Sequence, residues 1–517
     1  MDTSTPATCP FHDPHTLKEQ DVPVSVHSHR TLKNLPGPGG LPILGNILQL
    51  DLLRLHSILE QWAGTYGSLY KFRIARKNVV AVSDVNLINE VLRKRPAAYR
   101  RLESIAPVLN EMGINGVFSA EGDQWLRQRR TAMQALNTAH LKTFFPTLMK
   151  VTERLKKRWD RATTEGAPID VQEDLMRYTI DVTSNLAFGY DVNTLEDQGA
   201  DIQRHLEKVF PMVNRRINAP FPYWHFVKLP ADRALDKALV AIRSALTEFI
   251  AHSRKRLAQN PDLATHPTNF LEAMLAARDV DGGEITEEEI FGNVLTMLIG
   301  GEDSTAATMA WMLHFLTDHP DIQRRVQQEL DDVLGPSNLL HDFRDAERLR
   351  YLEAVSFETM RLKSVFPILF LGTNTDVELG GVQIPKGTAI FLLTRQCSMQ
   401  EREFTAADQF QPERWMAPHS GQEEGHNPKA FVPFGAGPRL CPGRNLTLLE
   451  MKSAMAMLFR NFSVAKSAFA KPVDEHFGFL MAPKNLSVTF HKRPRIDGRY
   501  LEQVDALDEC PVTSVGV

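Results

Sequence analysis

The chain has 517 residues, of which 43% are hydrophobic and 24% are charged, and its formal net charge is -4. This composition is ordinary for a globular protein with a large core, and the slight negative charge argues against nucleic acid or an anionic membrane as the principal partner. The four cysteines form no C-x-x-C pair and are far apart in the sequence, at Cys9, Cys397, Cys441 and Cys510. This pattern indicates a reducing compartment and argues against a disulfide framework.

The N-terminal residues 1–33 are polar, with no apolar stretch of signal-peptide length, and we interpret them as a disordered tail. Cys9 and His12 in this tail lack a second pair of ligands, so they do not indicate a metal site. No run of about 18 apolar residues occurs in the chain, so we expect no membrane-spanning helix. Residues 35–42 (LPGPGGLP) form a stiff, turn-rich connection after the tail.

The pattern of the following segments predicts a mainly α protein with a small β subdomain. Residues 67–83 alternate and carry β-branched side chains, which predicts short strands. From residue 85 to about 367 the pattern is mainly helical, and we expect breaks at Pro107, Pro146, Pro211, Pro220, Pro222 and Pro261. Residues 376–394 read as a β-hairpin with a further strand, and a second strand pair is expected near 474–491. Residues after about 495 are interpreted as a tail.

The longest uninterrupted helical pattern covers residues 284–318 and is long enough to cross a domain. Thr286 and Glu289 form a capping-box pattern at its start, and Pro320 ends it. Its apolar middle contains residues 300–305 (GGEDST). Two glycines inside a helix cost about 1 kcal/mol each relative to alanine, and carboxylates among apolar residues are unfavourable unless they are used. We therefore interpret these six residues as functional.

A glycine-rich loop at residues 434–443 (FGAGPRLCPG) carries Cys441 directly before a helical pattern. Cysteine binds metals as a thiolate, and the N-terminus of a helix stabilises that anion. Pro442 has no N–H, so the amides of Gly443 and Arg444 are expected to serve the sulfur. Arg439 is placed to reach a carboxylate of the same ligand. The loop is therefore expected to present a thiolate to a metal.

This loop resembles the haem-binding signature of the cytochrome P-450 family, F-x-x-G-x-R-x-C-x-G. All specified positions match, at Phe434, Gly437, Arg439, Cys441 and Gly443. The resemblance covers about residues 34–495 and implies the cytochrome P-450 fold, with residues 496–517 as a C-terminal tail. It also implies that the protein binds haem b (iron protoporphyrin IX) and that Cys441 is the axial ligand of the iron.

The glycine-containing part of the long helix resembles the oxygen-activation motif of the family, [AG]-G-x-[DE]-T-[TS]. Gly301, with Gly300, would then let haem, oxygen and substrate approach the backbone. Asp303 would be the acid of a proton relay, and Ser304 its alcohol. The usual threonine of the motif is Ser304 here, which lacks the methyl group that restricts the side-chain rotamer. Thr305 could replace Ser304 only if the helix were locally distorted.

Two further motifs support the resemblance. Glu358 and Arg361 match the E-x-x-R of the family, and Arg414 lies in its P-E-R motif, so these three residues are expected to form a structural network behind the haem. Trp125 and Arg129 match a W-x-x-x-R that contacts a haem propionate. The basic residue that usually follows near Pro367 is absent, which leaves one propionate contact unassigned.

The resemblance implies a haem-thiolate monooxygenase that inserts one oxygen atom from O2 into a hydrophobic substrate. No chain remains for a fused reductase, so electrons would come from a separate ferredoxin-type, flavodoxin-type or reductase donor. With the composition, the resemblance also implies a soluble, cytoplasmic protein without a membrane anchor. The alternatives are a peroxide-dependent peroxygenase, isomerase or dehydratase of the same family, and a haem carrier or gas sensor.

Substrate contacts are expected from apolar segments at residues 102–118, 205–227, 368–371 and 477–482, although helix packing explains their composition equally well. A positive surface that would steer an acidic redox partner is a further hypothesis, formed by Arg127, Arg129, Arg130, Arg439, Arg444 and Lys452.

Overall fold

The structure is a computed structural model that describes residues 30–196, 201–206, 208–219, 221–276, 286–416 and 426–493, with the backbone of 495–496 and 499–500. Most of the two predicted tails, including Cys9, His12 and Cys510, lies outside the described residues. The tail boundaries therefore stay predictions.

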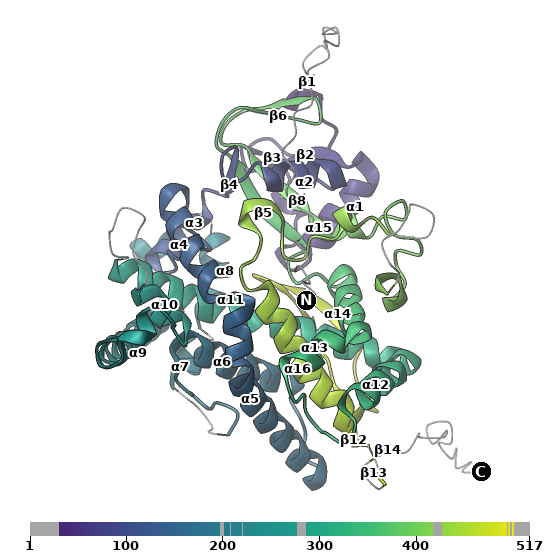
Figure 1. The fold of residues 1–517 in the computed structure, drawn as a ribbon. Coiled ribbons are helices and arrows are strands. Elements are labelled where there is room, and N and C mark those ends of the chain that lie inside the picture. The colour runs from purple at the N-terminus through teal and green to yellow at the C-terminus, as the bar shows by residue number, and fades with distance from the viewer. Residues whose placement is uncertain are drawn as a thin grey trace, which may run out of the picture.

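A five-stranded sheet lies at one end of the molecule, whereas β12, β13 and β14 lie at the other end (Figure 1). In sheet order its strands are β2 (Leu69–Ile74), β3 (Lys77–Val82), β8 (Ala389–Leu393), β5 (Ile368–Thr373) and β4 (Tyr99–Arg101). Strands β3 and β8 run parallel, and the other neighbours are antiparallel. Alternate residues of β3 pack with α1 (Leu55–Tyr66) on one face and with α2 (Val85–Arg93) on the other. This burial on both faces explains why residues 79–82 are all apolar.

The smaller sheets confirm the strands predicted in the second half of the chain. One of them has the order β1 (Arg30–Thr31), β7 (Val382–Ile384) and β6 (Val377–Leu379), so that β7 pairs with both neighbours. The other three are two-stranded and pair β10 (Asp474–Phe477) with β11 (Met481–Lys484), β9 (Phe462–Lys466) with β12 (Val488–Lys492), and β13 (Arg495–Ile496) with β14 (Arg499–Tyr500). Strand β9 was not predicted, because it follows directly on a buried helix and its partner is more than twenty residues away.

The rest of the described chain is mainly helical, as predicted. Its remaining α-helices are α3 (Ile105–Glu111), α4 (Gly122–Ala135), α5 (Thr138–Glu165), α6 (Val171–Phe188), α7 (Asp201–Leu206), α8 (Val209–Ile217), α9 (Pro230–Gln259), α10 (Phe270–Ala276), α11 (Glu287–Asp318), α12 (Pro320–Leu334), α13 (Phe343–Arg348), α14 (Arg350–Leu362), α15 (Thr394–Ser398) and α16 (Arg444–Asn461). Among the described residues, no helix is both long enough and apolar enough to traverse a lipid bilayer.

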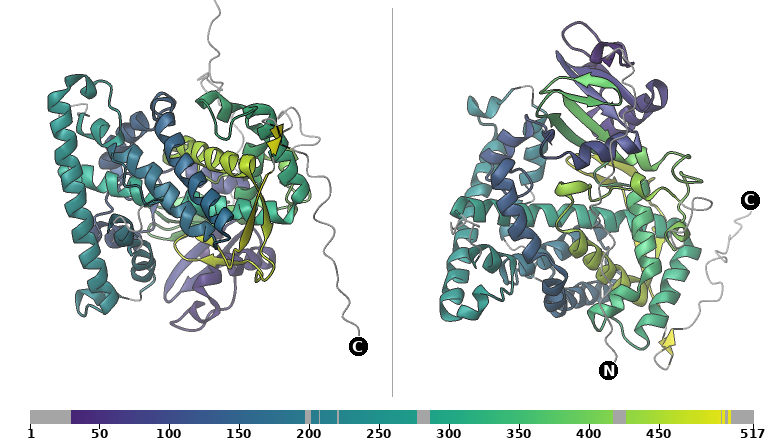
Figure 2. Two further views of the ribbon diagram at one scale, coloured as in Figure 1. Left: turned by 90° about the horizontal axis from the view of Figure 1, so that it is seen from below. Right: turned by 45° about the horizontal axis from the view of Figure 1, so that its top comes forward.

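Helix α11 is the predicted long helix and lies between α6 and α16 in the body of the molecule (Figures 1 and 2). Its start has the predicted capping box. The side chain of Thr286 accepts the backbone N–H of Glu289, and the side chain of Glu289 accepts the backbone N–H of Thr286. Pro320 begins α12 directly after it. Apolar residues on most sides of α11 are buried in three hydrophobic clusters, so the helix is a shared core element.

One predicted helix break is wrong. Pro146 lies inside the 28-residue helix α5, which continues through it. Proline in a helix interior costs about 3 kcal/mol, but burial of Phe144, Phe145 and Leu148 on either side offsets that cost. Pro107 and Pro211 lie in the first turns of α3 and α8, where a missing N–H is tolerated.

Candidate functional site

The loop that carries Cys441 is closed by its own backbone and packs on α2. The amide of Cys441 donates to the carbonyl of Phe434 (2.9 Å), and the amide of Leu440 donates to the carbonyl of Gly437 (3.1 Å). Gly437 has a φ of 67°, and a Cβ at this position would lie 2.7 Å from the carbonyl oxygen of Leu92. Glycine is therefore required for the loop to lie this close to α2.

The thiol of Cys441 lies at the N-terminus of α16. The backbone amides of Gly443 and Arg444 donate to it, as the sequence predicted. Burial raises the pKa of the Cys441 thiol above its ordinary value, while the two amides and the charge of Arg129 oppose that rise. Part of the side chain nevertheless remains exposed. A metal cation bonded to this sulfur would complete the stabilisation of its thiolate.

Arg439 points away from the loop toward the start of α4. Its Nη2 donates to Oε2 of Glu121 (2.5 Å) and to the carbonyl of Ala120 (2.8 Å), and its guanidinium lies 4.1 Å from the ring centroid of Trp125. Burial, together with the charge of Arg95, lowers the pKa of Arg439 from 12.5 to about 10, although Glu121 opposes the change. The Nε of Arg439 is buried and has no hydrogen-bond partner among the described residues.

Two further arginines, Arg95 and Arg101, belong to this cluster and were not predicted from the sequence. Burial, with the charges of Arg95 and Arg439, lowers the pKa of Arg101 from 12.5 to about 9. Arg95 is 8% exposed, and within the described chain its Nε is also buried without a partner. The dense basic stretch at residues 93–101 was the signal that could have identified both residues.

Strand pairing brings an arginine next to the segment after Pro367 that lacks a basic residue. Arg101 on β4 is the register partner of Leu371 on β5. A cation on the neighbouring strand therefore stands beside the segment in which the sequence left a propionate contact unassigned. Arg101 also donates to the carbonyl of Phe118 (2.9 Å and 3.2 Å) and lies 3.7 Å from its ring centroid.

The arginine cluster is suited to a ligand that carries carboxylates. The cluster is formed by Arg95, Arg101, Arg129 and Arg439, whose charges act on the pKa values of Arg101 and Arg439. Glu121 is the carboxylate that acts on the same two pKa values. Buried like charges are unfavourable without partners, and the unpartnered Nε atoms show that donor capacity remains. The two propionates of a haem would supply the missing anions. A thiolate at a helix N-terminus and a buried arginine cluster beside it fit haem b.

The predicted oxygen-activation residues lie in the middle of α11. Gly300 is exposed, and a Cβ there would meet open space, whereas a Cβ at Gly301 would lie 2.9 Å from Oγ1 of Thr183 in α6. Ser304 is partly exposed and donates to the carbonyl of Gly300 (3.1 Å). Gly300 and Ser304 thus share one open face of α11, while Gly301 permits close packing of α11 on α6.

Thr305 lies on a different face of α11 from Ser304. It is fully buried, and its hydroxyl contacts Thr447 (3.5 Å) and Glu450 of α16. Burial raises the pKa of the Glu450 carboxyl well above its ordinary value. These contacts favour Ser304 over Thr305 as the alcohol of the proposed relay.

Glu358, Arg361 and Arg414 are joined in one buried network, as the sequence predicted. Arg361 donates to both oxygens of Glu358 (2.8 Å and 2.9 Å), and both side chains are fully buried. Arg414 Nε donates to Oε1 of Glu358 (3.1 Å). Trp415, which was not predicted, donates its indole N–H to Oε2 (2.9 Å). The carboxylate is therefore fully used by structural partners.

The four segments predicted to contact substrate meet at one hydrophobic cluster. The side chain of Phe479 lies edge-on to Phe118 (6.4 Å between ring centroids) and to Phe366 (6.5 Å). Partly buried apolar side chains from each segment pack on this cluster, namely Leu102, Phe118, Ile217, Tyr223, Phe370 and Phe479. The side chains that these segments add to the cluster are thus apolar, and most of them are aromatic.

The predicted positive surface is smaller than expected. Lys452 is buried and pairs with Glu353, and Arg439 belongs to the interior cluster. Arg127 bonds Glu289 (3.0 Å). Arg130 and Arg444 are exposed.

Comparison with known proteins agrees with this geometry. The sequence model of the family described as Cytochrome P450 matches residues 35–490. The chain is 26% identical over 439 residues to Protein LUTEIN DEFICIENT 5, chloroplastic, of Arabidopsis thaliana, covering 83% of this chain and 73% of that protein. It is 27% identical over 480 residues to Cytochrome P450 27C1 of Danio rerio, covering 88% and 85% of the two chains. Cytochrome P450 3A5 of Homo sapiens is 26% identical over 453 residues, with coverage of 85% and 87%.

Proposed function

Because the chain belongs to the cytochrome P450 family of haem-thiolate monooxygenases, which bind haem b, we propose that it oxidises a bulky hydrophobic substrate with electrons from a separate redox protein. The observation that carries the site assignment is the position of the Cys441 sulfur at the N-terminus of α16, beside the arginine cluster. Cys441 would be the axial ligand of the iron. Trp125, Arg129 and Arg439 would hold the propionates, together with Arg95 and Arg101.

The haem supplies oxygen activation when it is bound. The hydroxyl of Ser304 donates its hydrogen bond to the carbonyl of Gly300. Rotation about χ1 can turn this hydroxyl toward the open face of α11. Asp303, the preceding residue, would replace that proton through water. Gly301 lets α11 pack closely on α6, which fixes the position of the relay. Phe434, Gly437 and Gly443 would hold the backbone shape of the loop beneath the haem.

The hydrophobic cluster around Phe118, Phe366 and Phe479 supports an apolar substrate of considerable size. Aromatic rings provide large contact areas with little loss of side-chain freedom. The exposed Arg130 and Arg444 would face an acidic electron donor of the ferredoxin, flavodoxin or reductase type. We propose that the domain with this activity spans residues 34–495.

The first experiment tests the assignment of Cys441. The reduced, carbon-monoxide-bound protein is expected to show the far-red-shifted Soret band of thiolate-ligated haem, and Cys441→Ser is expected to lose it. Cys397→Ser is the matched control, because Cys397 is fully buried and burial raises its pKa from 9.0 to about 12. An unchanged spectrum in Cys441→Ser, or an equal loss in both variants, would contradict the assignment.

The second experiment tests the reaction and the class of substrate. Steroids, terpenes, fatty acids and aromatic compounds are screened for a shift of the haem spin state on binding. Compounds that bind are then offered with O2 and a surrogate ferredoxin system, or with peroxide alone. Product with O2 and electrons supports the monooxygenase. Product with peroxide alone, and none with O2, would instead favour the peroxygenase.

A further inference from the structure

Five ionisable side chains meet at the base of the β10–β11 turn, whose tip contains Phe479 of the hydrophobic cluster. We refer to them as the charged anchor, which consists of His56 and Glu60 of α1, Lys363 directly after α14, Arg395 of α15 and Glu475 of β10. These elements are far apart in the sequence, so only tertiary folding brings the five side chains together. The sequence predicted none of them as a site residue.

The carboxylate of Glu475 lies at the centre of the anchor. Its Oε2 accepts a hydrogen bond from Nε2 of His56 (2.7 Å), and its Oε1 accepts Nζ of Lys363 (2.6 Å) and Nη1 of Arg395 (2.7 Å). Arg395 also donates Nε and Nη2 to the two oxygens of Glu60 (2.8 Å and 2.6 Å). The side chains of His56 and Arg395 are only 1% and 9% exposed. Charge-assisted hydrogen bonds with so little access to water are strong and directional, so they fix the position of Glu475.

The second strand of the turn is held by other contacts. Met481 on β11 is the register partner of Phe477 on β10, and residues 478–480 connect the two strands. The amide of Met481 donates to the carbonyl of Val365 (2.9 Å), and the carbonyl of Met481 accepts the indole N–H of Trp311 in α11 (3.2 Å). The first strand is therefore held by the charged anchor and the second by the central helix.

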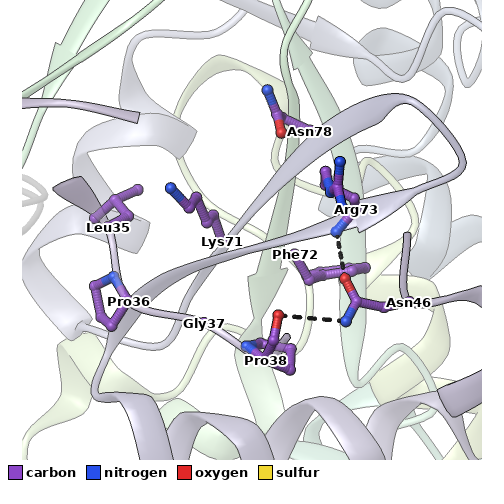
Figure 3. Close-up of a pocket in the computed structure, with 9 residues that line it drawn as sticks. All are labelled: Leu35, Pro36, Gly37, Pro38, Asn46, Lys71, Phe72, Arg73 and Asn78. Atoms are coloured by element: carbon purple, nitrogen blue, oxygen red, sulfur yellow. Dashed lines mark hydrogen bonds between the residues drawn. The ribbon is translucent and has the colours of Figure 1, made fainter. Parts of the chain in front are cut away.

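Helix α1, which supplies two residues of the anchor, is bonded to the five-stranded sheet. The hydroxyl of Tyr70 on β2 donates to the carbonyl of Leu59 on α1 (2.7 Å). Strand β2 is bonded in turn to Asn46, which accepts the amide of Arg73 (2.9 Å) and donates to the carbonyl of Pro38 (3.4 Å) in the wall of a pocket of about 370 Å³ (Figure 3). The anchor is thus attached to the sheet rather than to a loop.

The tip of the turn reaches the hydrophobic cluster. Phe479 lies edge-on to Phe118 and Phe366, with 6.4 Å and 6.5 Å between ring centroids. Phe479 and Leu480 are both partly exposed. Within the tip, the amide of Gly478 donates to the carbonyl of Leu480 (3.0 Å). Because only three residues connect the strands, a shift of the first strand would move the ring of Phe479 as well.

We propose that Glu475 is a positioning residue, which sets through the charged anchor how far Phe479 projects into the proposed substrate site. The inference rests on the proposed function, because that function assigns the cluster around Phe479 to the substrate. Glu475 acts through the turn and not by contact with the ligand. The substitution Glu475→Gln keeps the size of the side chain but removes the charge that holds Lys363 and Arg395, so the turn is expected to lose its fixed position.

The test measures the dissociation constants of two haem ligands for the full-length holoprotein from their optical difference spectra. Imidazole is small enough to bind without contact with the turn, whereas clotrimazole carries three aryl rings that have to fit beside Phe479. Glu475→Gln is expected to weaken clotrimazole binding about tenfold or more and to leave imidazole binding unchanged. Lys363→Met is expected to act in the same direction, because it removes one of the cations bonded to Glu475.

Asp331→Asn is the matched control for a general loss of stability. The carboxylate of Asp331 is also partly buried and also accepts hydrogen bonds from an arginine, Arg493 (2.8 Å), but it lies on α12. Its substitution should leave the affinity for both ligands unchanged.

Each outcome decides the inference. A loss of clotrimazole affinity in Glu475→Gln and Lys363→Met, with unchanged imidazole binding, supports it. Unchanged clotrimazole affinity in either variant, an equal loss in Asp331→Asn, or an equal loss of both ligands would overturn it and leave the proposed function intact. A wild-type protein that binds neither ligand, or imidazole alone, would overturn the proposed function and this inference with it.

Discussion

Trp415 donates its indole N–H to Oε2 of Glu358 at 2.9 Å, the oxygen that also accepts Nε of Arg361. The other oxygen, Oε1, accepts hydrogen bonds from the side chains of Arg414 and Arg361 and from the backbone amide of Gln411. Each oxygen of this carboxylate thus accepts hydrogen bonds from more than one group. The network joins α14 to residues 411–415, and the ring of Trp415 lies 4.7 Å from the ring of Phe431, three residues before the Cys441 loop begins.

Glu358→Gln is expected to lower the free energy of unfolding by about 3–5 kcal/mol, because it leaves buried guanidinium groups without their anion. Urea denaturation of the holoprotein measures this loss. Lys94→Ala serves as a control, since the pair of Lys94 with Glu90 is exposed and should cost less than about 1 kcal/mol. Similar losses in the two variants would contradict the structural role of Glu358.

Gly437→Ala and Gly435→Ala are expected to differ, although both glycines have positive φ angles of 67° and 73°. Each alanine carries a left-handed conformational cost of about 1–2 kcal/mol. At Gly437 the new Cβ would also lie 2.7 Å from the carbonyl of Leu92, whereas at Gly435 the nearest atom is 3.9 Å away. Haem content per protein and the unfolding free energy should therefore fall further in Gly437→Ala. Equal effects would show that backbone strain alone matters.

Glu475→Gln is expected to remove a contribution to stability that depends on pH. Burial alone would raise the pKa of Glu475, but the hydrogen bond from His56 (2.7 Å) and the charges of Arg395 and Lys363 hold that pKa well below 4.5. A carboxylate with a lowered folded pKa stabilises the protein above its unfolded pKa, and this stabilisation disappears as pH falls through the folded value.

The wild-type protein should therefore exceed Glu475→Gln by about 1.5–3 kcal/mol in unfolding free energy at pH 7. The difference should shrink progressively below about pH 4.5. Denaturant titrations across this range measure it, and Asp474→Asn is the control because its pair with Arg54 is exposed. A difference that stays constant with pH would refute the assigned charge.

Ser304→Thr is expected to increase the amount of product formed per O2 consumed, because the added methyl group restricts the rotamer that carries the relay hydroxyl. Ser304→Ala removes the hydroxyl and should lower this ratio about tenfold or more. Oxygen consumption and product are measured together with a substrate identified by the spin-state screen. Thr308→Ser, one turn along α11, is the control. If Ser304→Ala retained the wild-type ratio, Ser304 would not be the relay alcohol.

Local sequence patterns predicted those parts of the site that depend on neighbouring residues. The capping box of Thr286 and Glu289, the end of α11 before Pro320, and the two amides that serve Cys441 were all predicted from adjacent positions. The predicted break at Pro146 was wrong, because a local cost was outweighed by packing along the whole of α5.

The sequence alone predicted the loop that carries Cys441, the mainly helical fold and the place of Asp303 and Ser304 inside a long helix, since each depends on residues within a few turns of one another. Only the tertiary structure decided that Arg95 and Arg101 join Arg439 and that Thr305 faces α16. Burial and charge depend on which distant segments pack together, and no local pattern records that pairing.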